Sequence, residues 1–364
     1  MRLQLPSSVI RWRAHRFVRG VGLGALVCLG VPDAGQAQDL TTSWQSAVYS
    51  GSDRLLAFSV LNHSRPAGAE AFLQGVAVRD GQAHQPGQWP QMVSGSFSLA
   101  PIVGYDPNLN SGVHAKTIGI GGDVMFTVDE DSRAKAGFTI GAKLTSRHAW
   151  SVAKGQVLTF DSELAYSFAP QHGLDTKTAY AKICLDSHVA GWTWLSSCAG
   201  GAYVEKTTEV REAFLETSAT QIFTSGRADH LVRVSLRQTY RSEYEKTTVS
   251  LKSVNAIPRL GSLGFEVSYG ENVPGHNTTR YGVSAWLSRP IAGRVTSLSA
   301  AWSQTGGGSF FGTKQRDNNY SISIGRQLTD QFSASIGYAW TNSSVSAFDT
   351  GSVQFGIGIK GVSF

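Results

Sequence analysis

Residues 350–364 read TGSVQFGIGIKGVSF, and the sequence ends on Phe364. Four apolar residues alternate here with small or polar ones: Val353, Phe355, Ile357 and Ile359. A period of two is the pattern of a β-strand with one apolar face. Val362 and Phe364 fall out of this register, and a bulge near Lys360–Gly361 would restore it. The stretch therefore predicts a terminal strand.

A terminal strand that ends on an aromatic residue resembles the closing strand of bacterial outer-membrane β-barrels. The resemblance implies that Phe364 lies where the last strand meets the first, so that the sheet has no free edge. Stretches with the same alternation recur between turn-forming clusters. Named by first and last apolar residue, they include Phe97–Tyr105, Ile118–Val128, Phe138–Leu144, Leu158–Phe168, Val232–Tyr240, Leu263–Tyr269, Tyr281–Leu287, Leu298–Trp302, Tyr320–Ile324 and Phe332–Trp340.

The sequence contains about fifteen such stretches, whereas closed barrels of this type usually have an even number of strands. We attribute the surplus to the region between Thr176 and Phe223, where the pattern is least regular. The prediction is a transmembrane antiparallel up-and-down β-barrel of about fourteen strands, within a range of about twelve to sixteen. A soluble β-sandwich or propeller is the alternative.

Charged residues on the second face of these strands favour the membrane barrel, because the inner faces of a sandwich are apolar. The predicted lumen-facing charges are Asp161, Glu163, Arg233, Arg237, Arg241 and Glu266. The three arginines share one strand face at steps of ~13 Å. Two roles remain open for them: selection of anions, or ion pairs with the three carboxylates across the lumen. Since interior charges are usually paired, we favour the second.

Residues 1–37 have the pattern of a secretory signal peptide. Five arginines precede an apolar run from about Val21 to Val31, and Gly35-Gln36-Ala37 supplies small residues for cleavage after Ala37. The run is too short to span a bilayer as a helix. A Sec-type signal on a barrel predicts the outer membrane of a Gram-negative bacterium.

Without the signal, the chain keeps 27 of its 32 basic and 25 of its 26 acidic residues, a net charge of +2. This balance gives no support to a nucleic-acid partner. Residues 38–92 have helical spacing, first with Leu55, Leu56, Phe58 and Leu61 and again over 68–78, after Pro66. We expect two short facing helices and a linker in the periplasm, followed by a barrel over residues 93–364.

Two cysteines remain after removal of the signal, Cys184 and Cys198. The periplasm is oxidising, so we expect a disulfide between them. The residues between them are centred on Gly191, and symmetric pairing about that residue would place the cysteines opposite each other in a hairpin. The bond is expected to be structural rather than redox-active.

The sequence predicts no enzyme, cofactor or metal site. It contains no GxSxG, HExxH or CxxC spacing. Asp106, Asn108 and Asn110 offer oxygen ligands that suit calcium, but no acidic partner follows them, so a structural turn is favoured. Asp229 beside His230 is a candidate acid–base pair, for which a turn before a strand is the simpler explanation.

Residues 97–112 read FSLAPIVGYDPNLNSG, and this stretch, with the helices before it and the barrel after it, resembles the surface lipoprotein assembly modifier family. The resemblance covers about Ser94 to Phe364. It implies a periplasmic helical-repeat domain, a fourteen-strand barrel and a role in moving lipoproteins to the cell surface. The helical part here is about one hairpin, where the family has several repeats.

The expected function is therefore non-enzymatic translocation of a protein or lipoprotein to the cell surface. The partners implied are outer-membrane lipid, the exported cargo and the barrel assembly machinery. A passive, porin-like channel for small solutes is the alternative, which the charged interior favours.

Overall fold

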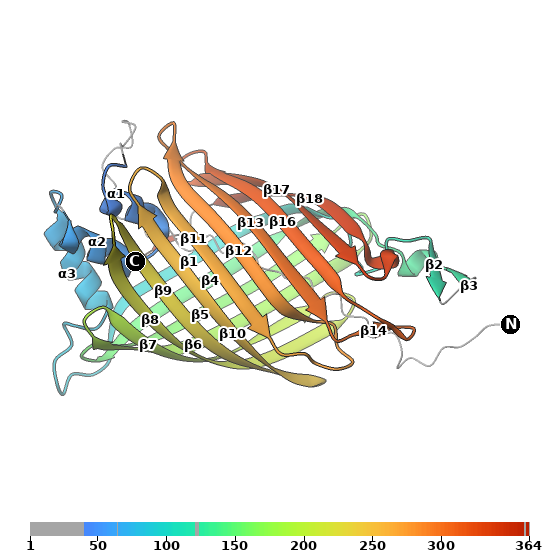
Figure 1. The fold of residues 1–364 in the computed structure, drawn as a ribbon, viewed down its shortest axis with the longest axis horizontal. Coiled ribbons are helices and arrows are strands. Elements are labelled where there is room, and N and C mark those ends of the chain that lie inside the picture. Colours follow the sequence, from blue (N-terminus) through green and yellow to red (C-terminus); the bar gives the residue numbers. More distant parts are fainter. Residues whose placement is uncertain (1–39, 64, 121–123, 360–361, 364) are drawn as a thin grey trace.

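The computed structural model describes residues 40–63, 65–120, 124–359 and 362–363. The predicted signal peptide, the bulge at Lys360–Gly361 and Phe364 lie outside these residues. The chain forms one antiparallel barrel, with helices at one end and long loops at the other (Figure 1). We call these the helix end and the loop end.

Fourteen long strands build the barrel wall in the described part of the chain, which confirms the predicted fold class. They are β1 (Gln91–Asp106), β4 (Gly137–Ala153), β5 (Gln156–Ala169), β6 (Leu174–Ala190), β7 (Thr193–Glu205), β8 (Glu209–Ser225), β9 (Ala228–Arg241), β10 (Tyr244–Ile257), β11 (Gly261–Gly270), β12 (Thr278–Ile291), β13 (Arg294–Gly306), β16 (Asp317–Gln327), β17 (Phe332–Ser343) and β18 (Thr350–Ile359). The short strand β19 (Val362–Ser363) pairs with β1 and closes the ring.

The surplus strand of the sequence count lies in the first long loop. The stretch from Ile118 to Val128 forms a small separate hairpin, β2 (Thr117–Ile120) and β3 (Val124–Thr127), which projects beyond the loop end (Figure 1). Gly121 and Gly122 lie between its two halves. The region between Thr176 and Phe223, which we suspected, instead contains regular parts of β6, β7 and β8. Period-two alternation does not distinguish a membrane strand from a loop hairpin.

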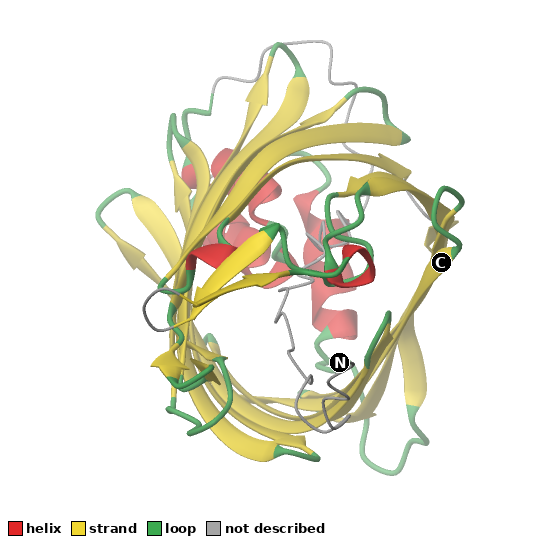
Figure 2. Ribbon diagram, turned by 90° about the vertical axis from the view of Figure 1, so that its right-hand side faces the viewer, coloured by secondary structure: helices red, strands yellow, loops and turns green. Residues whose placement is uncertain are grey.

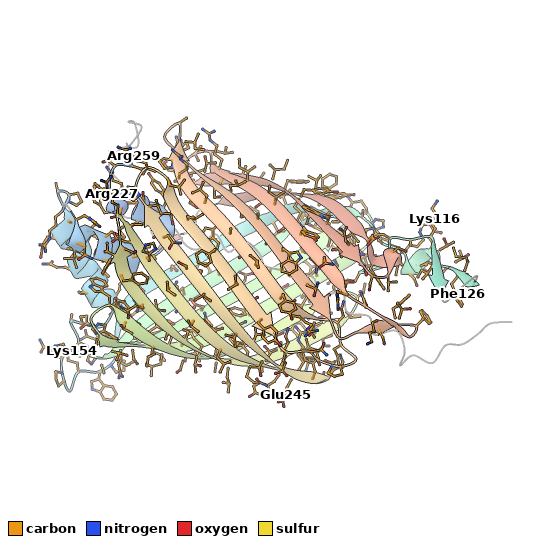
Figure 3. All side chains as sticks on the ribbon, in the orientation of Figure 1. Lys116, Phe126, Lys154, Arg227, Glu245 and Arg259 are labelled. Atoms are coloured by element: carbon orange, nitrogen blue, oxygen red, sulfur yellow. A yellow bond between two sulfur atoms is a disulfide. The ribbon has the colours of Figure 1, made fainter. Side chains whose placement is uncertain are left out.

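The outer surface of the barrel is apolar because one residue in two along each strand faces outward. Leu99 is 65% exposed, Ile140 53% and Ile357 58%, values that a water-soluble surface would rarely show over so many strands. Such an apolar band is the surface that contacts lipid in membrane barrels. Figure 3 shows charged side chains beyond this band, with Lys154, Arg227 and Arg259 at the helix end and Lys116 and Glu245 toward the loop end.

Short turns join the strands at the helix end, and one of them is the predicted turn at Gly191, whose φ of 53° suits glycine. The loop end carries the long connections, with the hairpin β14 (Ser309–Phe310) and β15 (Thr313–Lys314) and the short helices η2 (Glu130–Ser132) and η3 (Ser346–Phe348). Short turns on the periplasmic side and longer external loops are typical of outer-membrane barrels. We therefore expect the helix end to face the periplasm.

The helices are α1 (Ser43–Ala47), η1 (Val48–Ser50), α2 (Asp53–Asn62) and α3 (Ala69–Arg79). The predicted helical segment before the barrel is confirmed, and α1 and η1 were not predicted. Leu61 is exposed, whereas Leu55 and Phe58 are buried. None of the described helices has the length and apolarity needed to cross a bilayer.

The hydrophobic core lies between these helices and the inner face of the barrel, not within the barrel wall. Leu55, Phe58 and Val60 of α2 pack in one buried cluster with Trp194 and Ile222 of the wall. Figure 2, viewed from the loop end, shows the helices within the outline of the barrel at its far end. We call residues 40–84 the helical segment.

Candidate channel lumen

Eight cationic side chains and five carboxylates lie on the inner faces of β4–β11, away from the contacts with the helical segment. On each strand these residues alternate with the exposed apolar residues of the outer face, so they face the lumen. The cations are Lys143, Arg147, Lys182, Arg233, Arg237, Arg241, Lys246 and Lys252, and the carboxylates are Asp161, Glu163, Glu212, Glu216 and Glu266.

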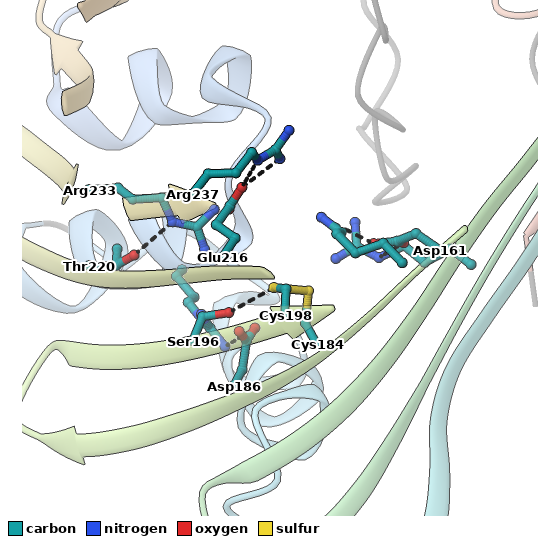
Figure 4. Close-up of a disulfide and its surroundings, with 12 residues drawn as sticks. Asp161, Cys184, Asp186, Ser196, Cys198, Glu216, Thr220, Arg233 and Arg237 are labelled. Atoms are coloured by element: carbon teal, nitrogen blue, oxygen red, sulfur yellow. Dashed lines mark hydrogen bonds and ion pairs between the residues drawn. A yellow bond between two sulfur atoms is a disulfide. The ribbon is translucent and has the colours of Figure 1, made fainter. Parts of the chain in front are cut away.

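Cations and carboxylates occupy different strands. The cations are on β4, β6, β9 and β10, and the carboxylates on β5, β8 and β11, so every acidic strand has a basic strand beside it. Arg237 Nε donates to Glu216 at 2.7 Å, and Arg241 Nε donates to Glu212 at 2.9 Å (Figure 4 shows the first pair). Both pairs join β9 to its neighbour β8.

The ion pairs of β5 have the same arrangement. Glu163 lies 3.7 Å from Lys143, and Asp161 lies 3.3 Å from Arg147 and 3.8 Å from Lys182. Our expectation that the three arginines pair with Asp161, Glu163 and Glu266 across the lumen is therefore wrong. Residues on adjacent strands have Cβ atoms only ~5 Å apart, so lateral pairs form without closing the lumen.

Two lumenal cations differ from the others. Arg233 donates from Nε to Thr220 Oγ1 at 3.1 Å, and the Lys246 ammonium donates to the Thr279 carbonyl oxygen. Within the described residues, no carboxylate lies within ion-pair distance of either. Arg233 is also the direct cross-strand partner of Lys252, whose other cross-strand partner is Glu266.

Solvent reaches these inner side chains. The side chain of Arg147 is 61% exposed, and those of Glu163 and Arg237 are each 38% exposed. Charges in a dry protein interior are buried and fully paired, because removing an ion from water without compensation costs several kcal/mol. The exposure and the unpaired cations together indicate a water-filled lumen.

The inner face of the remaining strands is uncharged away from the loop end. Apart from residues at the loop end, the described inner positions of β12, β13, β16, β17, β18 and β1 carry small or neutral side chains. Examples are Ser299 and Ser323, whose hydroxyl oxygens lie 2.7 Å apart, and Gly337. We call β4–β11 the charged arc and the remaining strands the neutral arc.

The predicted disulfide between Cys184 and Cys198 is present, and the hairpin register is confirmed. The two cysteines are direct cross-strand partners on β6 and β7. Both alternate with outward residues such as Ile183 and Leu195, so the bond lies on the inner face of the charged arc, near Glu216 and Arg237 (Figure 4). Cys198 is the direct cross-strand partner of Glu216, so the bond lies beside the Arg237–Glu216 ion pair.

Arg54 of α2 is the main polar contact between the helical segment and the wall. Its Nε donates to Asp80 at the end of α3 at 2.9 Å, and its Nη2 lies 3.6 Å from Asp186 of β6. The guanidinium also stacks 4.6 Å from the ring centroid of Trp194. One side chain thus connects two helices and two strands.

Further contacts fix the ends of the segment. His63 Nε2 lies 3.1 Å from Asp229, a fully buried carboxylate of β9, and Ser46 Oγ donates to the Ile257 carbonyl oxygen at 2.7 Å. The amide of Gly155 donates to the Gly81 carbonyl oxygen at 3.0 Å. The helical segment is therefore attached along one side of the helix end of the barrel, from the β4–β5 turn to β10.

The other candidate sites have structural partners. Asp229 faces His63, whereas His230 Nδ1 lies 2.6 Å from Asn255, so the two do not form an acid–base pair. Asp106 pairs with Lys206 at 2.7 Å, and Asn108 donates to the Gly112 carbonyl oxygen, which closes the first loop turn. The described residues contain no group of three or more metal-ligating side chains.

Comparisons with known proteins show likeness of fold only. No family model and no curated protein matches the chain. OpdK of Pseudomonas aeruginosa with vanillate has a TM-score of 0.39 and 8% identity, over 74% of this chain and 99% of that chain. A BenF-like porin from Pseudomonas fluorescens Pf-5 has 0.40 and 6%, with the same coverage. OccK2 (OpdF) of P. aeruginosa in complex with glucuronate has 0.36 and 8%, over 76% and 99%.

All three TM-scores are below 0.5, so these likenesses carry no conclusion about function or location. The proposed resemblance to the surface lipoprotein assembly modifier family is wrong, because no family model matches the chain. Residues 97–112 supply β1 and the first turn, a structural role that explains the motif without the family. The expected role in protein translocation is withdrawn with it.

Proposed function

We propose that this protein is a passive channel for small polar solutes. The observation that carries the proposal is the inner wall of the barrel, where solvent-exposed charges on β4–β11 face serine and glycine on the opposite strands. A wall that only supported a protein fold would be dry and packed. This wall is solvent-exposed and lined by polar groups, as a route for solutes in water requires.

The helical segment limits the size of solute. It occupies part of the periplasmic mouth, and its apolar contacts with Trp194 and Ile222 bury the inner face there. The buried Leu55 and Phe58 hold α2 in place through hydrophobic burial, ~2 kcal/mol for each side chain. The remaining opening lies beside the neutral arc, which the described helices contact little.

The proposal is tested by adding purified, refolded full-length protein to planar lipid bilayers in symmetric potassium chloride. We expect stepwise increases of current that stay open at low voltage. Liposomes containing the protein should also swell in small sugars but not in large ones, because the mouth is narrowed. Empty liposomes and heat-denatured protein are the controls.

Absence of current from folded protein, verified by its heat-modifiable migration on gels, would remove the channel proposal. Unselective passage of large sugars would contradict the narrowing by the helical segment while leaving the channel intact. The two parts of the proposal are therefore separable.

A further inference from the structure

We infer that the channel favours small anions, an inference that rests on the proposed channel function. Within the charged arc, the eight lumenal cations outnumber the five lumenal carboxylates by three. At the loop end of the neutral arc, Asp106 is paired with Lys206, and Asp317 is buried among Asn277, Thr305 and Gln315. Two further wall carboxylates, Asp186 and Asp229, face Arg54 and His63 of the helical segment. The surplus therefore belongs to the lumen itself.

The surplus charge can be assigned to particular residues. Arg233 and Lys246 have no carboxylate within ion-pair distance among the described residues, and Arg147 and Lys182 share the single carboxylate of Asp161. Every other lumenal cation has a carboxylate partner or cross-strand neighbour of its own. One surplus charge therefore stands at each of three places in the wall.

These three places are distributed along the passage. Lys246 is close to the loop end of β10, and Arg233 is in the half of β9 nearer the helix end. Arg147, Asp161 and Lys182 are direct cross-strand partners in the middle of the wall. Arg233 pairs with Lys252, six residues from Lys246, so these two charges are ~20 Å apart along the strand. The Debye length is ~30 Å in 0.01 M salt, so at low ionic strength the fields of the surplus charges overlap along the passage.

The neutral arc gives this charge its effect. Away from the loop end, the inner positions of β12, β13, β16, β17, β18 and β1 carry serine, glycine and other neutral residues, and no carboxylate that would attract cations to this wall. A moving ion therefore meets a net positive field on one side and neutral hydroxyl groups on the other. A lumen lined by one net sign of charge concentrates the oppositely charged ion.

The test is the reversal potential of full-length protein in a planar bilayer with a gradient of potassium chloride, at low ionic strength. We expect a chloride-to-potassium permeability ratio above one, which falls as ionic strength rises. In the double variant Arg233→Gln/Lys246→Gln the ratio should fall toward one, because two of the three surplus charges are lost.

Arg326→Gln is the matched control. Arg326 is a basic residue on the outer face of β16, and it is exposed, so its removal changes the total charge of the protein but not that of the lumen. We expect the permeability ratio of this variant to equal that of the unmodified protein. An equal fall in the control would show that the lumen is not the origin of the selectivity, which overturns the inference.

The outcomes separate this inference from the function it rests on. Current with a permeability ratio of one or below in the unmodified protein overturns anion preference and leaves the channel standing. No current overturns the channel itself. Since the unmodified protein already decides the question, failure of the double variant to fold does not remove the test.

Discussion

Arg54 is the residue on which docking of the helical segment depends most. Its guanidinium contacts Asp80, Asp186 and the ring of Trp194, and its side chain is only 20% exposed. We expect Arg54→Ala to weaken docking of α2 and α3 by ~1–3 kcal/mol, because it leaves two half-buried carboxylates without their partner. Hydrogen exchange of residues 53–79 measures the loss.

The matched control is Arg65→Ala. Arg65 is an exposed arginine between α2 and α3 and has the same charge as Arg54. Exchange in the helical segment should be unchanged by this substitution, and exchange in the barrel strands should be unchanged by both. Equal protection of α2 in the Arg54 variant and the unmodified protein would show that the apolar core alone holds the segment.

Asp80 makes docking of α3 sensitive to pH. Burial raises the pKa of the Asp80 carboxyl above its ordinary value, and the Arg54 guanidinium only partly offsets this effect. A raised pKa in the folded state means that protonation favours docking. The stabilising contribution is complete at low pH and is lost as pH rises through the raised pKa.

We therefore expect protection of α3, corrected for intrinsic exchange rates, to increase when pH falls from about 7 to about 4. Asp80→Asn should remove this part of the pH dependence, because the amide does not titrate. The difference between the two proteins isolates the contribution of Asp80, because every other titratable group is common to both. If protection of α3 depends on pH in the same way in the unmodified protein and in Asp80→Asn, the effect belongs to a group other than Asp80.

At the scale of elements, the β6–β7 hairpin is held by the disulfide as well as by its hydrogen bonds. The sequence separation of Cys184 and Cys198 is 14 residues. A loop of this size corresponds to ~3 kcal/mol in the chain-entropy account of disulfides. The double variant Cys184→Ser/Cys198→Ser should therefore unfold at lower urea concentration, followed by tryptophan fluorescence.

Unmodified protein unfolded with a reductant present provides the comparison. It should unfold at the same urea concentration as the double variant, since both lack the cross-link. Identical midpoints for the oxidised, reduced and serine forms would mean that the hairpin gains no stability from the bond.

Elements were predictable where the sequence pattern is local. Alternation along β9 or β17 and helical spacing in α2 both follow from the period of the structure itself. The hairpin turn at Gly191 could be predicted because Gly191 lies midway between Cys184 and Cys198 in the sequence. The β2–β3 hairpin was counted as a strand because Ile118 to Val128 alternates like a wall strand, and only its position relative to the barrel distinguishes it.

At the scale of the whole molecule, the helical segment and the barrel make separable contributions to the conductance of the channel. Deletion of residues 40–84 should raise single-channel conductance, because it clears the periplasmic mouth where α2 packs on Trp194. The hydrogen-bonded ring of strands does not include these residues, so the barrel should still close. Single-channel recording in planar bilayers gives the answer.

A deletion of residues 117–127 is the matched control for this experiment. It removes the β2–β3 hairpin, which projects away from the loop end (Figure 1). Conductance should stay as in the full chain. If both deletions raise conductance equally, or neither changes it, the helical segment does not limit flow.

The residues of the lumen were predictable from alternation, but their partners were not. Arg237 pairs with Glu216, a residue that the sequence analysis did not name, because the register of β8 against β9 brings them together. Register depends on all neighbouring strands and cannot be read from one of them. The docking of α2 against Trp194 and Asp186 likewise needs the closed barrel, since these residues lie far apart from it in the sequence.

The disulfide also has a consequence for biogenesis. Oxidation in the periplasm requires no closed barrel, because Cys184 and Cys198 belong to one local hairpin. Once formed, the bond forbids a one-residue slip between β6 and β7. Such a slip would turn Lys182 toward the lipid, at a cost of ~2–4 kcal/mol near the bilayer midplane. The register of β6 against β7 is thus fixed before the chain inserts into the outer membrane.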